Sequence, residues 1–167
     1  MVKHMACALF MAASIVSFHC SAAQAAAEGP EAVVRGFYEK YIAADGRMDL
    51  SRFAELDKAF TDKIAAMKAK AAKENPELGG LDFDPVIWGQ EFPAAITVLK
   101  PVLNGDAALV TVGKSWPEEK EPSAFICASL RKKEGAWRIV DLVDPLLFEK
   151  TGCASFKPGA MFPELPE

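Results

Sequence analysis

AFICASLRKKEGAWRIVDLV, residues 124–143, decides the fold. Both halves of this stretch are rich in β-branched and aromatic residues, and their apolar positions largely alternate with polar ones. Glu-Gly at positions 134 and 135 separates the halves and is compatible with a tight turn. The pattern predicts two strands, 124–133 and 136–143, that pair as a hairpin.

Two more strands are predicted just upstream, over residues 95–103 and 107–116, with Asn-Gly-Asp between them. A polar segment bounded by prolines, residues 117–123, leads from them to the hairpin and is expected to be an exposed loop. Consecutive strands with such short connections form an antiparallel meander. The sequence therefore predicts a four-stranded antiparallel sheet.

Two amphipathic helices are predicted before the sheet. Apolar residues recur at helical spacing between Pro30 and the Asp-Gly pair at 45 and 46, which indicates the first helix. Asp49 or Ser51 can cap a second helix that runs to Asn75, with residues 61 and 62 as a second capping position where it could break. Because both helices precede the meander, they are expected to cover one of its faces, which gives an α+β domain.

A linker of distinct character, DFDPVIWGQ at residues 82–90, separates the helices from the strands. Asp84 is a suitable N-cap and Pro85 a suitable first residue for one short helical turn, with Gly89 closing it. The linker thus predicts an ordered turn between the two layers.

Three runs of residues resemble the exported bacterial family called domain of unknown function 3828: VRGFY at 34–38, DFDPVIWGQ at 82–90 and GAWRIVD at 135–141. Helices followed by a curved meander also resemble the nuclear transport factor two-like, or cystatin-like, fold. The resemblance implies a cone in which the curled sheet and the first helix enclose a pocket. It implies no single activity, since scaffolds of this kind host isomerases, dehydratases and binding modules.

The amino terminus has the features of a secretory signal peptide. A short basic start precedes a mostly apolar run over residues 5–18, and small residues follow at 21–26. A membrane span needs ~20 apolar residues, more than this run supplies. We expect a signal peptide over 1–26, a cone domain over 27–145, an irregular tail over 146–167, and a periplasmic or secreted protein without a stable membrane anchor.

Cleavage near residue 26 narrows the possible chemistry. Both histidines, His4 and His19, would leave with the signal peptide, so catalytic arrangements and zinc sites that need an imidazole are excluded. The sequence contains no phosphate-binding glycine loop and no cysteine or histidine cluster, and we expect neither a metal nor a cofactor. The net charge of −4 argues against nucleic acid as a partner.

Cysteine usage predicts a disulfide. Cys7 and Cys20 lie in the signal peptide, where Cys20 leaves a lipidated amino terminus as an alternative to simple cleavage. The other pair, Cys127 and Cys153, would meet in an oxidising compartment. A bridge between them would tie the tail to the sheet and stabilise the fold by about 3 kcal/mol. Two buried free thiols are the alternative.

Asp141 is the candidate catalytic residue. Alternate residues share a strand face, so Asp141 is expected on the face of Trp137 and Ile139. If that face lines a pocket, the carboxyl group would have a raised pKa and could act as a general acid or base, as in isomerases of the resembled superfamily. A hydrogen-bonded structural aspartate near a strand end is the plainer interpretation.

Several further residues could bind a ligand. Aromatic side chains with polar tips suit an amphipathic molecule in a pocket, although they could equally fill the core. The linker adds a carboxylate and an amide. The candidate binding residues are Tyr38, Tyr41, Asp84, Trp88, Gln90, Trp116 and Trp137.

Three functions remain open. The first is a non-catalytic periplasmic module that binds a small amphipathic ligand or an envelope protein, as a monomer or a homodimer. The second is a small isomerase or dehydratase that uses a pocket carboxylate. The third is an immunity or inhibitor protein that caps a partner with the acidic loop at 118–121 or with the tail. An enzyme needs an enclosed pocket, whereas an interaction protein needs a filled interior and exposed apolar surface.

Overall fold

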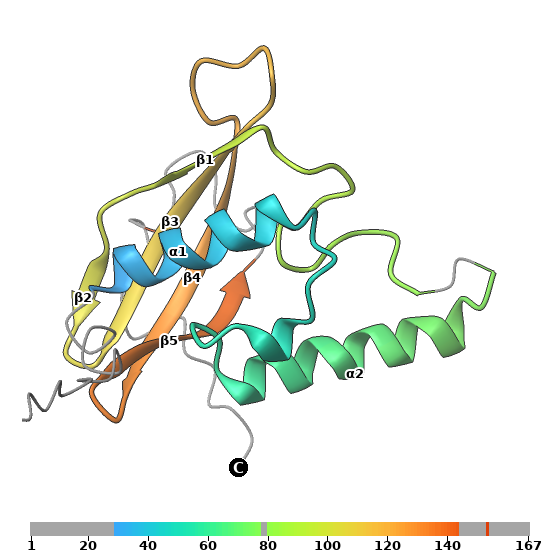
Figure 1. Cartoon of the computed structure of the whole chain (residues 1–167), viewed down its shortest axis with the longest axis horizontal. Coiled ribbons are helices and arrows are strands. Elements are labelled where there is room, and N and C mark those ends of the chain that lie inside the picture. The colour runs from blue at the N-terminus through green and yellow to red at the C-terminus, as the bar shows by residue number, and fades with distance from the viewer. Residues whose placement is uncertain (1–28, 78–79, 144–152, 154–167) are drawn as a thin grey trace, which may run out of the picture.

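The computed structural model describes residues 29–77, 80–143 and 153, so the predicted signal peptide and all of the predicted tail except Cys153 lie outside the described residues. Two α-helices and a short 3-10 helix precede five strands (Figure 1). The elements in chain order are α1 (Pro30–Ala43), η3 (Leu50–Arg52), α2 (Lys58–Glu74), β1 (Ala95–Val98), β2 (Val102–Asn104), β3 (Ala107–Ser115), β4 (Ala124–Lys133) and β5 (Ala136–Val143).

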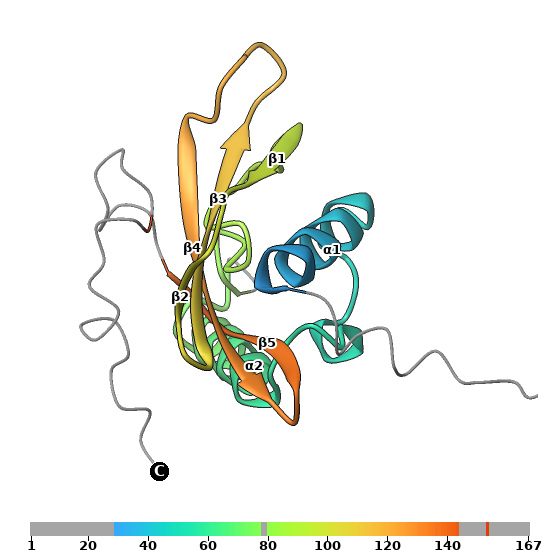
Figure 2. The same ribbon diagram turned by 90° about the vertical axis from the view of Figure 1, so that its left-hand side faces the viewer.

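The strands form one antiparallel sheet in the order β1-β3-β4-β5, with β2 also paired to β3. Figure 2 shows the curved sheet nearly edge-on, with α1 lying across one face and α2 below it near β5. The predicted α+β class, with helices packed on an antiparallel meander, is confirmed. The loop between β3 and β4 projects beyond the sheet (Figure 1).

The predicted strand over 95–103 is divided, so the sheet has five strands and not four. Val98 pairs with Val112, but Val102 pairs with Leu109, which leaves one extra residue on the outer side between the two pairs. Pro101 lies in this interruption, where its missing N–H group costs no ladder hydrogen bond. β1 and β2 are therefore two parts of one interrupted edge strand.

The predicted second helix begins later than expected. Asp49 caps only η3, by accepting a hydrogen bond from the backbone N–H of Ser51, and α2 begins after Asp57, whose carboxylate accepts from Ala59. The expected break at residues 61 and 62 is wrong, because α2 is continuous from Lys58 to Glu74.

The segment before α2 is extended because it pairs with the edge of β5. The backbone N–H of Asp57 donates to the carbonyl of Ile139 over 2.8 Å, and the N–H of Ile139 donates to the carbonyl of Glu55 over 2.8 Å. These two hydrogen bonds cover part of the β5 edge and set the point at which α2 begins.

A β-bulge separates the two halves of the β4–β5 ladder. Leu130 pairs with Ile139, whereas Ser129 pairs with Asp141, so Val140 is the extra residue. Since neighbouring residues of β4 point to opposite faces, Ile139 and Asp141 also point to opposite faces. The expectation that they share a face is wrong for this reason.

The core fills the space between the sheet and the helices. Aromatic rings of α1 lie at its centre, where Phe37 packs edge-on against Tyr38 and Phe53 and stacks with Tyr41. Tyr38 is 0 % exposed and Tyr41 is 1 % exposed. The sheet contributes a buried layer below these rings: Val98, Ala108, Val110, Val112, Ile126, Ala128, Leu130, Ile139 and Leu142.

A second buried cluster lies on the other face of the sheet. It joins Leu109 and Cys127 to Cys153, with Val102 and Val143 packed against them. Cys127 and Cys153 form the predicted disulfide, with their Cα atoms 5.6 Å apart. The backbone N–H of Cys153 also donates to the hydroxyl of the β3 residue Thr111. The disulfide therefore holds Cys153, 26 residues after Cys127 in the sequence, against the face of the sheet that points away from α1.

Candidate functional site

The linker forms a tight turn organised by the Asp84 carboxylate. Its Oδ1 accepts hydrogen bonds from the backbone N–H groups of Val86 (2.7 Å) and Ile87 (3.2 Å). The N–H of Asp84 in turn donates to the carbonyl of Gly89 over 2.8 Å. Residues 85–88 form turns and no helix, so the predicted helical turn is wrong, although Asp84 accepts main-chain hydrogen bonds as a capping residue would.

Two tyrosines of α1 fasten this turn to the helix. The Tyr41 hydroxyl donates to Oδ2 of Asp84 over 2.6 Å, and the Tyr38 hydroxyl donates to the carbonyl of Val86 over 3.0 Å. Burial, and then the neighbouring Asp84 carboxylate, raise the pKa of both phenols well above the usual value. Both hydroxyls therefore stay protonated and act as hydrogen-bond donors at neutral pH.

Lys114 attaches the other side of the turn to the sheet. This β3 residue is 4 % exposed, and its Nζ donates to the carbonyls of Ile87 (2.6 Å) and Trp88 (3.3 Å). The ammonium also lies 5.7 Å from the centre of the Trp116 ring. Sequence reasoning missed Lys114, although it falls at the same alternate positions as Val110 and Val112 and so had to face the helices.

The indole of Trp88 completes the contacts of the turn. Its Nε1–H donates to the carbonyl of Leu142 in β5 over 3.2 Å, and its ring stacks on Phe83. Trp88 adopts a backbone φ of 47°, which non-glycine residues rarely occupy. The turn is thus held by α1, β3 and β5 together.

The structure brings together some of the predicted binding residues and separates others. Tyr38, Tyr41, Asp84 and Trp88 meet at the turn, and Trp116 reaches it through Lys114. Gln90 is exposed, and Trp137 is partly buried and packs against the core. The buried members serve packing and hydrogen bonding within the core.

Asp141 is engaged by a helix residue. Its carboxylate accepts two hydrogen bonds from Lys63 Nζ of α2, over 2.9 and 3.1 Å, and one from the N–H of Leu142. The bulge directs it away from the core-facing side of β5. These contacts are those of a structural aspartate that links α2 to the sheet.

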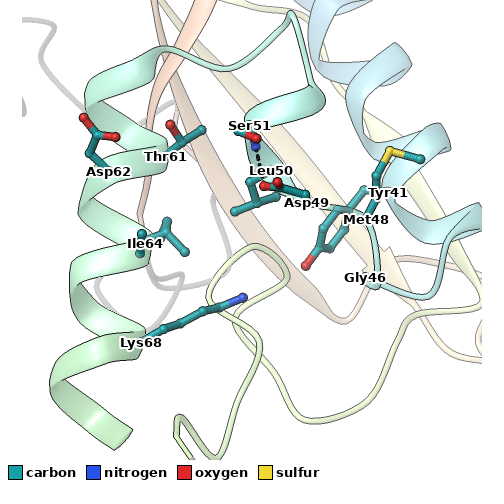
Figure 3. Close-up of a pocket in the computed structure, with 11 residues that line it drawn as sticks. Tyr41, Gly46, Met48, Asp49, Leu50, Ser51, Thr61, Asp62, Ile64 and Lys68 are labelled. Carbon is teal, nitrogen blue, oxygen red and sulfur yellow. Dashed lines mark hydrogen bonds between the residues drawn. The ribbon is translucent and has the colours of Figure 1, made fainter. Parts of the chain in front are cut away.

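An open pocket of about 260 Å³ lies between α2 and the segment after α1 (Figure 3). Ile64 and Lys68 reach toward it from α2, and the Tyr41 hydroxyl points into it from the opposite side. Its volume is below the roughly 300–1,000 Å³ of typical small-molecule sites. The other lining residues are Gly46, Met48, Asp49, Leu50, Ser51, Thr61, Asp62 and Ala65.

Two structural features are absent from the described part of the chain. There, no group of three or more histidine, cysteine, aspartate or glutamate side chains is placed to hold a metal ion. Among the same residues, no helix has the length and apolar character that crossing a membrane requires.

Comparison with known proteins shows a similarity of fold to a solved structure. No family model and no curated protein matches the sequence. A chain of the type VI native effector-immunity complex Tae3-Tai3 from Ralstonia pickettii matches with a TM-score of 0.50 and 19 % identity, over 70 % of this chain and 94 % of that one. A chain of the selenomethionine form of that complex matches with a TM-score of 0.48 and 20 % identity, over 70 % and 96 %. The first match shows that this chain shares its α+β fold with a component of an effector-immunity complex.

Proposed function

We propose that this chain is an immunity-type protein that binds an effector protein and blocks it. The observation that carries the proposal is the fold shared with a chain of the Tae3-Tai3 complex over almost the whole of that chain. A chain in such a complex works by forming a protein interface. The proposal therefore takes the third function left open by the sequence, an immunity or inhibitor protein that caps a partner, and makes that partner an effector.

The filled interior supports an interaction role over catalysis. Phe37, Tyr38 and Tyr41 pack against one another between α1 and the sheet, and all three are almost fully buried. The candidate base Asp141 is paired with Lys63 on the other side of the strand. The isomerase or dehydratase alternative gains no support from this geometry.

The place of action is part of the same proposal. The signal peptide expected over residues 1–26 would deliver the protein to the periplasm, and the Cys127–Cys153 disulfide suits an oxidising compartment. An immunity protein there would meet effectors that arrive from neighbouring cells. We also propose that the chain is a member of the nuclear transport factor two-like superfamily and has the cone shape that this membership implies.

A competition experiment tests this function. The gene is deleted from the source bacterium, and the deletion strain is mixed on a solid surface with its parent. We expect the deletion strain to be outcompeted, and to survive when it carries the full chain. A chain without residues 1–26 should fail to protect. Attackers with an inactivated type VI secretion apparatus serve as the control.

Equal survival of the deletion strain and the parent would contradict the immunity function. Protection by the leaderless chain would contradict the periplasmic site of action while leaving immunity itself intact. Mass spectrometry of the exported protein without reductant checks the cleavage site in the same cells.

A further inference from the structure

The outer edge of the sheet leaves main-chain groups available. Asn104 and Ala107 flank the two-residue turn of the β2–β3 hairpin, so they exchange both of their hydrogen bonds. The next pair, Leu103 and Ala108, is then a non-hydrogen-bonded pair. The N–H and C=O groups of Leu103 consequently point away from β3, toward the open edge.

The same alternation holds in β1. The N–H of Leu99 donates to the carbonyl of Thr111 over 2.9 Å, so the preceding pair, Val98 and Val112, is not hydrogen-bonded. The N–H and C=O groups of Val98 therefore also point outward. Within the described residues no strand pairs with this side of β1 and β2, whereas residues 55–57 cover part of the β5 edge.

Exposed leucines flank these outward groups. In the described part of the chain three large apolar side chains are exposed, and two of them are Leu103 at 59 % and Leu99 at 43 %. Exposed apolar side chains beside unpaired main-chain groups match the features by which a sheet edge accepts an extended peptide. The third exposed side chain, Met48, lies at the pocket of Figure 3 and not at this edge.

The charge of Lys100 indicates which kind of peptide segment can bind at this edge. Lys100 is exposed between the two leucines and makes no ion pair with any other described residue. A second copy of the chain, paired antiparallel along residues 95–104, would bring two Lys100 side chains close together, and like charges across a ladder are unfavourable. A different protein with an acidic residue at that position would form an ion pair instead.

We propose that the β1–β2 edge, residues 98–103, accepts an extended segment of the effector as an additional strand. Apolar residues of that segment cover Leu99 and Leu103, and an acidic residue faces Lys100. The inference rests on the proposed immunity function and names the surface and the partner chemistry through which it works.

Substitutions in the full chain test the edge in the competition experiment described above. Leu103→Pro removes the outward N–H group and leaves the hydrogen bonds of Val102 and Asn104 to β3 in place. Leu103→Thr keeps that N–H group but loses apolar surface. Lys100→Glu reverses the charge, and Lys73→Glu makes the same change on the exposed face of α2 as the matched control.

We expect Leu103→Pro and Lys100→Glu to lower the survival of complemented cells about tenfold, Leu103→Thr to have an intermediate effect, and Lys73→Glu to protect like the wild type. Melting temperatures of the purified proteins check folding. If Leu103→Pro is unfolded, Leu103→Thr and Lys100→Glu decide the question, because neither alters the backbone.

Full protection by the edge variants, in cells where the wild type protects, would overturn the edge proposal and leave the immunity function standing. Failure of the wild type itself would overturn both. A purified wild-type dimer that Leu103→Pro converts to a monomer would assign the edge to a second copy of the chain, which also overturns the effector as its occupant.

Discussion

The hydroxyl of Tyr41 lies 2.6 Å from Oδ2 of Asp84, and this hydrogen bond joins α1 to a turn that follows it by 43 residues. The other oxygen of the same carboxylate holds the turn itself together. One aspartate thus satisfies two backbone donors and one phenol. The turn and the helix are consequently stabilised as a unit.

Asp84→Ala should therefore lower the free energy of unfolding by about 2–3 kcal/mol, because three donors lose a partly buried charged acceptor. Urea denaturation of the purified protein measures this. Asp82→Ala, two residues away and exposed, is the control and should change stability by less than about 0.5 kcal/mol. Equal values for the two variants would contradict the role given to Asp84.

The two tyrosines should titrate only when the protein unfolds. Burial and the Asp84 carboxylate raise the pKa of Tyr38 and Tyr41 in the folded state, while unfolded tyrosine has a pKa of about 10. A raised folded pKa gives stability that is complete below pH ~10 and is lost as the pH rises above it. Since the chain has 2 tyrosines, tyrosinate absorbance should appear in one step together with loss of helical circular dichroism. Tyrosinate formed in the folded protein near pH 10 would disprove this.

Asp57 should contribute to stability at neutral pH and lose its contribution in acid. Burial would raise its pKa, but the hydrogen bonds from Lys133 and from the N–H of Ala59 outweigh this and lower it. A lowered folded pKa gives stability that is present above the unfolded value of about 3.9 and lost as the pH falls through the folded value. Asp57→Ala should cost about 1 kcal/mol at pH 7 through loss of the N-cap, and less at pH 3. Urea midpoints at both pH values check this, and a cost that is larger in acid would refute it.

Gly46 should resist substitution. Its φ is +64°, and a Cβ atom there would lie 2.5 Å from Cζ of Phe92 and 3.0 Å from Oδ2 of Asp84. Gly46→Ala therefore combines backbone strain with a clash and should destabilise by about 2–3 kcal/mol. Gly105→Ala, at φ +57° with open space around it, carries the backbone cost alone, about 1 kcal/mol. A thermal melt that ranks the two variants in the opposite order would count against this account.

The disulfide should account for a measurable part of the stability. Cys127 and Cys153 are separated by 26 residues, and opening that loop should lower the free energy of unfolding by about 3 kcal/mol. Urea denaturation with and without a reductant measures the change. The Cys127→Ala/Cys153→Ala double variant is the control, since its stability should not respond to reductant. A wild type that is equally indifferent to reductant would show that the bridge adds nothing.

Much of the sheet could be predicted from the sequence. The strands β4 and β5 begin and end at the predicted residues, and β3 ends one residue early at Ser115. Alternation of apolar and polar residues and a short polar turn are local patterns, so they can be recognised in a single sequence. The division of the first predicted strand also had a local signal in Pro101, which cannot donate to a ladder.

Other features depend on contacts between distant residues and could not be predicted. Phe53 and Leu56 have helical spacing, yet hydrogen bonds to Ile139 hold residues 55–57 extended. The bulge at Val140 follows from the register of β4 against β5, and it reverses the face expected for Asp141. The bond between Tyr41 and Asp84 likewise exists only once α1 has packed over the sheet.

The fastening of the linker turn has a consequence for divergence among related chains. Tyr38 and Lys114 hold the turn through the main-chain carbonyls of Val86, Ile87 and Trp88, not through their side chains. Every amino acid supplies such a carbonyl. Residues 86 and 87 can therefore be replaced by other residues that tolerate burial without changing the path of the main chain. Related chains can in this way keep the turn while their sequence similarity is lost.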